Sequence, residues 1–174
     1  MKHIIFAIVA LATIFATYGE NLNRTYWGCE MGKTEQSACA DSIKSLFKKE
    51  QIEPRTEGNF VIAEKVWLYG YEFDAAKLEF ENSKLKSILL TKNFFGLDDA
   101  DRFLREIAPK FIGTEARPNN AGLLTRQDGS TLIRMAQSEG ETGDANIEIV
   151  IVDLKKQHNR LIKRLNFVNY LFSK

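Results

Sequence analysis

Apolar residues recur at helical spacing in three stretches of the chain. Four of them, spaced i, i+4, i+7 and i+8, predict a first helix over residues 35–50: Cys39, Ile43, Leu46 and Phe47. A second stripe predicts a helix over residues 99–108, which Pro109 should end because proline disfavours helical geometry in the residue before it. The last helix is expected over residues 153–172, with its stripe at Leu154, Leu161, Ile162, Leu165, Val168 and Phe172.

Three strands are expected after the first helix. Residues 60–69 are rich in β-branched and aromatic side chains, which favour a strand. Residues 76–92 alternate between apolar and polar positions and predict a hairpin that turns at Asn82-Ser83. The alternation breaks near Ser87, which indicates a β-bulge in the returning strand.

Three more strands are expected after the second helix. Residues 123–135 predict a hairpin that turns at Asp128-Gly129, where glycine accepts the positive φ of a tight turn. Residues 147–152 form a near-continuous apolar run, which is typical of a strand with neighbours on both sides.

These elements predict one α+β domain with the order α-βββ-α-βββ-α, a mainly antiparallel sheet and helices packed on one face. Two possible half-repeats cover residues 34–93 and 98–152, although the halves share no evident residue-level identity. No linker long enough to separate two domains interrupts this pattern.

The first 19 residues read as a signal peptide for export. A short polar start with Lys2 precedes an apolar run from Ile4 to Phe15, and small residues follow up to Gly19. This run is shorter than the roughly 20 residues that a membrane-spanning helix needs, so cleavage is favoured over an uncleaved anchor. We therefore expect a mature domain of residues 20–174, located in the periplasm or secreted.

The composition excludes several classes of protein. The chain is 44% hydrophobic and 27% charged, which is typical of a globular domain. It has 24 basic and 23 acidic residues, and loss of Lys2 with the signal peptide makes the two numbers equal. A globally basic nucleic-acid-binding protein is therefore not expected.

Part of the sequence resembles a known class of small exported modules. The Tyr26-Trp27-Gly28 stretch before the first helix, and the hairpin from Leu78 to Ile88, are similar to the modules built like β-lactamase inhibitory protein and the small outer-membrane assembly lipoproteins. The resemblance implies a binding or assembly role without catalysis. The chain departs from that pattern because it has no lipid-attachment cysteine and has an added final helix.

Two cysteines, Cys29 and Cys39, are expected to form a disulfide, because an even count in an exported chain favours pairing. A metal site and a cofactor are not expected. Zinc lacks further ligands, and the acidic loop with Glu139, Glu141 and Asp144 does not have the spacing of a calcium-binding loop.

No arrangement of residues typical of catalysis stands out, so the chain is not expected to be an enzyme. His158 is the one histidine of the mature chain, and it lies beside the polar face of the last predicted helix. A role as a general base is an alternative to a plain surface position. An envelope hydrolase or a small-ligand-binding protein with an unrecognised site remains the alternative function.

Candidate partner-binding residues are aromatic or basic. Trp27 is one of five aromatic candidates for interface anchors, the others being Tyr26, Trp67, Tyr69 and Tyr71. Five basic residues gather on the last predicted helix, where they suit an acidic partner or an anionic membrane surface: Lys155, Lys156, Arg160, Lys163 and Arg164. The alternative for both groups is ordinary packing or solvation. The function expected from the sequence is an exported, non-catalytic protein-binding or assembly module of the bacterial envelope.

Overall fold

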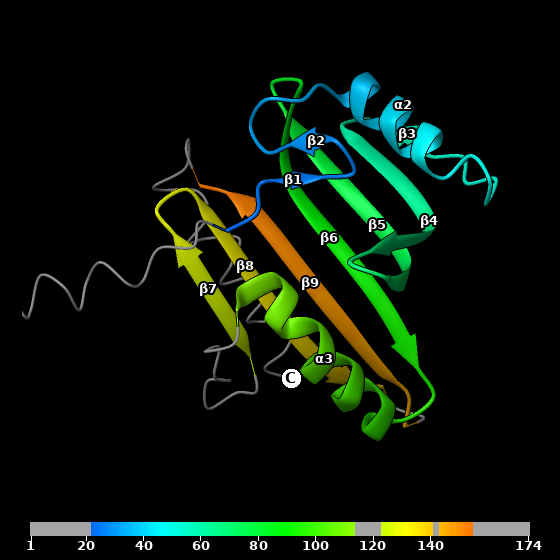
Figure 1. Ribbon diagram of the computed structural model, residues 1–174, viewed down its shortest axis with the longest axis vertical. Coiled ribbons are helices and arrows are strands. Elements are labelled where there is room, and N and C mark those ends of the chain that lie inside the picture. The colour runs from blue at the N-terminus through cyan, green and yellow to red at the C-terminus, as the bar shows by residue number, and fades with distance from the viewer. Residues whose placement is uncertain (1–21, 114–122, 141–142, 155–174) are drawn as a thin grey trace, which may run out of the picture.

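A computed structural model describes residues 22–113, 123–140 and 143–154. It contains a single α+β domain with two helices and a seven-stranded antiparallel sheet (Figure 1). The predicted fold class is therefore confirmed at this level. The predicted last helix, apart from its first two residues, lies outside the described residues, and Asp153 itself ends a strand.

Eleven elements make up the described chain. A small hairpin, β1 (Thr25–Tyr26) and β2 (Cys29–Glu30), precedes helix α2 (Gln36–Leu46). Four strands follow: β3 (Arg55–Glu57), β4 (Phe60–Leu68), β5 (Tyr71–Glu81) and β6 (Lys84–Phe94). Helix α3 (Leu97–Ile112) leads to the last three: β7 (Leu124–Asp128), β8 (Thr131–Glu139) and β9 (Ala145–Asp153).

The sheet consists of two meanders that meet at its centre. The strand order is β3-β4-β5-β6-β9-β8-β7, so the last strand of each meander pairs with the other. Ile88 lies opposite Ile151, and Leu90 lies opposite Ile149. The prediction that residues 147–152 form a central strand is confirmed, because β9 has β6 on one side and β8 on the other.

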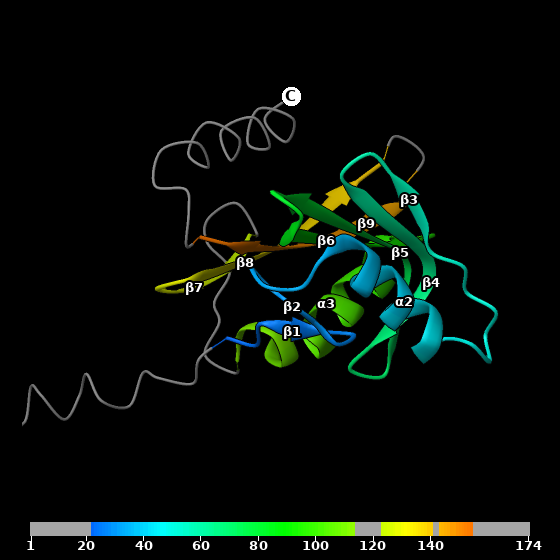
Figure 2. The same cartoon turned by 90° about the horizontal axis from the view of Figure 1, so that it is seen from above.

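Both helices and the β1–β2 hairpin cover the same face of the sheet, which we call the inner face (Figure 2). Alternate residues of the strands point into the core beneath them, among them Val61, Leu78, Ile88, Ile133 and Ile151, all fully buried. On α3, Phe103 packs edge-on against the rings of Tyr71 and Phe73. The expected packing of helices on one face is thus confirmed for α2 and α3.

The prediction that Pro109 ends the second helix is wrong. Helix α3 continues through Pro109 to Ile112 and stops at Gly113, whose φ of +80° suits glycine. The last turn is held by burial: Phe111 and Ile112 are 4% and 2% exposed, and the Phe111 ring meets that of Tyr69 at 5.1 Å. Burying these side chains outweighs the hydrogen bond that proline removes.

The first helix is shorter than predicted, and the first meander is longer. Helix α2 ends at Leu46, four residues before the expected end, and the chain turns through Gln51 at a φ of +58°. Strand β5 begins at Tyr71 and forms a tight hairpin with β4 through Tyr69-Gly70, both at positive φ. Neither this turn nor the short strand β3 was predicted from the sequence.

Candidate binding groove

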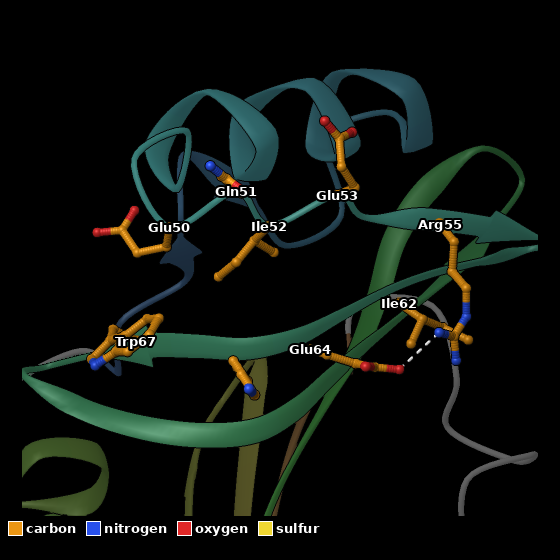
Figure 3. Close-up of a pocket in the computed structure, with 9 residues that line it drawn as sticks. Glu50, Gln51, Ile52, Glu53, Arg55, Ile62, Glu64 and Trp67 are labelled. Carbon is orange, nitrogen blue, oxygen red and sulfur yellow. Dashed lines mark hydrogen bonds and ion pairs between the residues drawn. The ribbon is translucent and has the colours of Figure 1, made fainter.

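A groove lies at the β4 edge of the sheet, between β4 and the segment of residues 47–54 that follows α2 (Figure 3). Its volume is about 340 Å³. The segment above it and the strands below supply nine lining residues: Glu50, Gln51, Ile52, Glu53, Arg55, Ile62, Glu64, Lys65 and Trp67. A second hollow of about 410 Å³ lies on the α2 side of the same segment, so residues 51–53 separate two depressions.

Three apolar side chains line the groove. Ile52 points from the upper segment toward β4, and Ile62 and Trp67 come from β4 itself (Figure 3). Ile52 is 9% exposed, whereas Ile62 and Trp67 are only half-buried. The groove therefore presents partly uncovered apolar surface beside the core.

Trp67 is held in place from two directions. Its ring packs against that of Phe47 with the centroids 6.1 Å apart. The backbone carbonyl of Trp67 accepts a hydrogen bond of 2.8 Å from the indole nitrogen of Trp27. A large aromatic side chain that is already ordered loses little conformational entropy on binding, which suits an interface anchor.

Charged side chains form the rim. Arg55 donates to Glu57 and Glu64 at 2.8 Å each, and Lys44 approaches Glu53 at 2.6 Å. The Glu64 and Glu57 carboxylates raise the pKa of Arg55 further above its usual value, so this side chain stays charged. These pairs are exposed to solvent, so they contribute little to stability.

The groove borders a stretch of β4 that pairs with β5 on one side and, among the described residues, has no strand on the other side. Strand β3 pairs with Phe60–Ile62 and then ends. Beyond it, Ala63–Val66 includes Lys65 at a φ of +55°, a conformation that interrupts a regular strand edge. An interrupted edge with an exposed lysine resists pairing with a long extra strand. The site is therefore shaped for a short segment or a single side chain.

The described residues hold no group of three or more His, Cys, Asp or Glu side chains that is able to bind a metal ion. Glu139 and Asp144 lie at the two ends of the β8–β9 connection, while Glu141 and His158 lie outside the part of the chain described. No helix in the described ranges is long and apolar enough to cross a membrane.

Cys29 on β2 and Cys39 on α2 lie together in the core, both fully buried. A hydrogen bond between the two side chains raises the pKa of Cys39, and burial of its thiol raises it further. The sulfurs are not at bonding distance, and both residues are free cysteines in this structure. The two predicted partners are thus neighbours, and the disulfide itself stays a prediction.

The other predicted binding residues do not gather at the groove. Trp27 is 8% exposed, so its side chain belongs to the core, where its indole supports the Trp67 backbone. The five basic residues from Lys155 to Arg164 lie outside the described residues. Of the five aromatic candidates, only Trp67 lines the groove. Ile52 and Ile62 were missed, because the position of the 47–54 segment over β4 depends on tertiary packing.

Comparison of the chain with protein-family models, curated protein sequences and solved structures finds no significant match. The resemblance to small exported binding modules therefore stays an expectation from sequence.

Proposed function

We propose that the mature chain is an exported, non-catalytic protein-binding or assembly module of the bacterial envelope. The observation that carries the proposal is the groove of Ile52, Ile62 and Trp67 at the β4 edge. It combines an ordered aromatic side chain with apolar neighbours and a charged rim, which is the composition of a typical interaction site.

The partner suited to this groove is a short segment with one or two apolar side chains. An apolar side chain inserted beside the half-buried Ile62 and Trp67 would cover their exposed apolar surface, at a gain of roughly 25 cal/mol per Å². The paired carboxylates and bases of the rim would remain in water. They would influence the choice of partner more than the affinity.

The predicted last helix offers a second contact. Its basic residues, including Lys156 and Arg160, suit an acidic partner or an anionic membrane surface. A partner with an apolar segment beside an acidic one would engage both regions. Two modest contacts on one chain raise the overall affinity when both are able to form at once.

The alternative is a hydrolase or a small-ligand-binding protein. The groove volume falls at the lower end of the 300–1,000 Å³ range of small-molecule sites. The charged groups around it are exposed rim pairs, whereas ligand sites usually aim a few buried polar groups at the ligand. This geometry favours the binding role.

A matched pair of variants tests the proposal. Tagged mature protein is used to capture partners from an envelope extract, as wild type, as Ile62→Lys and as Leu97→Ser. Leu97 is 39% exposed and lies at the start of α3, away from the lining residues. A partner retained by wild type and Leu97→Ser but lost with Ile62→Lys supports the groove. Equal capture by all three, or turnover of ester, peptide or glycoside substrates that Ile62→Lys abolishes, would overturn the proposal.

A further inference from the structure

The face of the sheet opposite α2 and α3, which we call the outer face, carries an apolar patch at its centre. On β6, β9 and β8, the positions that alternate with the core residues bring together five apolar side chains: Leu89, Val150, Val152, Leu132 and Ala136. Two charged residues share this face, Arg134 opposite Val150 and Glu148 opposite Ala136. Val150 lies opposite Leu89 on one side, and Val152 lies opposite Leu132 on the other. No described helix lies on this face (Figure 2).

Two residues of the patch are nevertheless buried. Val152 is 5% exposed and Leu132 is 7% exposed, close to the values in the core. Glu148 lies opposite Ala136 on this face and is half-buried. Burial raises the pKa of its carboxyl. Strand β9 is apolar on both faces from Ile149 to Val152, which is typical of a strand covered on both sides.

The chain itself supplies a suitable cover. Strand β9 ends at Asp153, immediately after Val152, and residues 155–174 follow. In a helix, Leu161, Leu165, Val168 and Phe172 fall on one side, and Lys156, Lys163 and Arg160 fall on the other. Eighteen helical residues, 155–172, extend about 27 Å at 1.5 Å each. The nine residues of β9 extend about 30 Å, so the two lengths match.

The other segments outside the described residues start from less suitable positions. Leu22, at the end of residues 1–21, bonds through its backbone N–H to Asp128, beside the β1–β2 hairpin of the inner layer. Residues 114–122 connect α3, on the inner face, to the edge strand β7. Residues 141–142 connect β8 to β9 at the end of these strands away from Val152. Among these segments, only the one after Leu154 therefore begins next to the buried part of the patch.

We infer that residues 155–174 form an amphipathic helix that returns along β9 and covers the outer face. Its apolar stripe packs against Leu89, Val150 and Leu132, and its basic residues face solvent. The domain then has three layers, with α2 and α3 on one face of the sheet and this helix on the other. This inference is independent of the proposed groove, because it concerns strands β6, β9 and β8, none of which lines the groove at the β4 edge.

Engineered cysteines in the full mature chain test the arrangement. Leu165→Cys is combined in turn with Leu89→Cys, Ala136→Cys and Val150→Cys, and each pair is oxidised and mapped by peptide mass spectrometry. The matched controls replace Leu165→Cys with Lys163→Cys, on the opposite side of the expected helix. Wild-type protein, oxidised in parallel, accounts for Cys29 and Cys39. We expect a crosslink within one chain for at least one Leu165→Cys pair, at a yield independent of protein concentration, and none for the Lys163→Cys pairs.

Three results would overturn the inference: no crosslink with Leu165→Cys, equal crosslinking with Lys163→Cys, or crosslinks only between chains. The last would show that a second copy covers the face. As an independent measurement, a chain ending at Leu154 should bind more of the dye 8-anilinonaphthalene-1-sulfonate and melt at a lower temperature. Unchanged dye binding and melting would also contradict the inference.

Discussion

Arg24 and Asp153, 129 positions apart in the chain, form an ion pair of 2.9 Å at one end of the sheet. The Asp153 side chain is 7% exposed and that of Arg24 is 20% exposed. The same guanidinium also donates to the carbonyls of Met31 and Ser130. A single side chain thus fastens the segment before α2 to the end of the last strand.

Arg24→Ala should destabilise the domain by about 3 kcal/mol, because it leaves the buried Asp153 carboxylate without this partner. Chemical denaturation followed by circular dichroism measures the loss. The matched control is Lys33→Ala, since Lys33 pairs with Glu30 at the surface with 69% of its side chain exposed. That variant should lose no more than about 1 kcal/mol. Equal losses for the two variants would show that the Arg24–Asp153 pair contributes no more to stability than the exposed Lys33–Glu30 pair.

Cys29 and Cys39 should be oxidised to a disulfide in protein isolated from the exported fraction. The two side chains are already in contact within the core, and the proposed export would place them in an oxidising compartment. Thiol labelling of denatured, unreduced protein should find no free thiol. Reduction should then lower the free energy of unfolding by roughly 2.5–3 kcal/mol, the chain-entropy value for a loop of this length. Full labelling of both cysteines would rule the disulfide out.

Binding at the groove should shift the fluorescence of Trp67 to shorter wavelength. Trp67 is half-buried and lines the groove, whereas Trp27, the other tryptophan of the chain, is already buried. Titration with the captured partner, or with a peptide derived from it, should therefore change the emission of wild-type protein. The same titration of Trp67→Phe, which retains Trp27, should leave the emission nearly constant. A shift of equal size in both proteins would place the contact elsewhere.

Glu148→Gln should stabilise the domain at neutral pH and have less effect in acid. Burial raises the pKa of Glu148 in the folded state, so the folded protein holds its proton more tightly than the unfolded chain does. The corresponding stability is fully present below the unfolded pKa and is lost as the pH rises through the folded pKa. The glutamine variant should lose this part of the pH dependence, which thermal melts from pH 4 to pH 8 would reveal. Parallel pH profiles for the two proteins would contradict the prediction.

The basic residues of the predicted last helix should serve binding and not stability. Lys156→Glu combined with Arg160→Glu should weaken association with an acidic partner while the melting temperature stays nearly constant, because exposed charges contribute little to folding. The association of wild type should also weaken as salt rises. Leu165→Ala, on the apolar stripe, should instead cost about 2–5 kcal/mol of stability. Unchanged binding of the double variant at low salt would exclude a role for the basic residues.

The strands could be predicted best from sequence where neighbouring residue types alone determine the structure. The turn at Asn82-Ser83 follows from its residue types, and both residues adopt positive φ. The bulge expected near Ser87 is present: Ser87 and Leu85 pair with consecutive residues of β5, which leaves Lys86 between them. The local signal there was the break in alternation itself.

The elements that sequence could not place depend on packing between distant segments. Pro109 is tolerated because Phe111 and Ile112 are buried beyond it, and nothing near Pro109 in sequence announces that burial. Likewise, the groove exists because the turn after α2 carries Ile52 over β4. Trp67 could be recognised from the sequence as a candidate aromatic anchor. Nothing in the sequence marked Ile52 and Ile62 as binding residues, because only the fold brings them to the same groove as Trp67.

The pairing of β6 with β9 sets the order in which the sheet is able to close. Phe94 lies opposite Ala145, 51 positions later, and Ser87 lies opposite Val152, 65 positions later. The first meander forms from short hairpins, but its β6 edge stays unpaired until the final strand β9 is present. A chain halted before Ala145 would present the full length of β6 to other chains. Such a fragment would aggregate through that edge, so under the proposed export this domain would fold only after translocation is nearly complete.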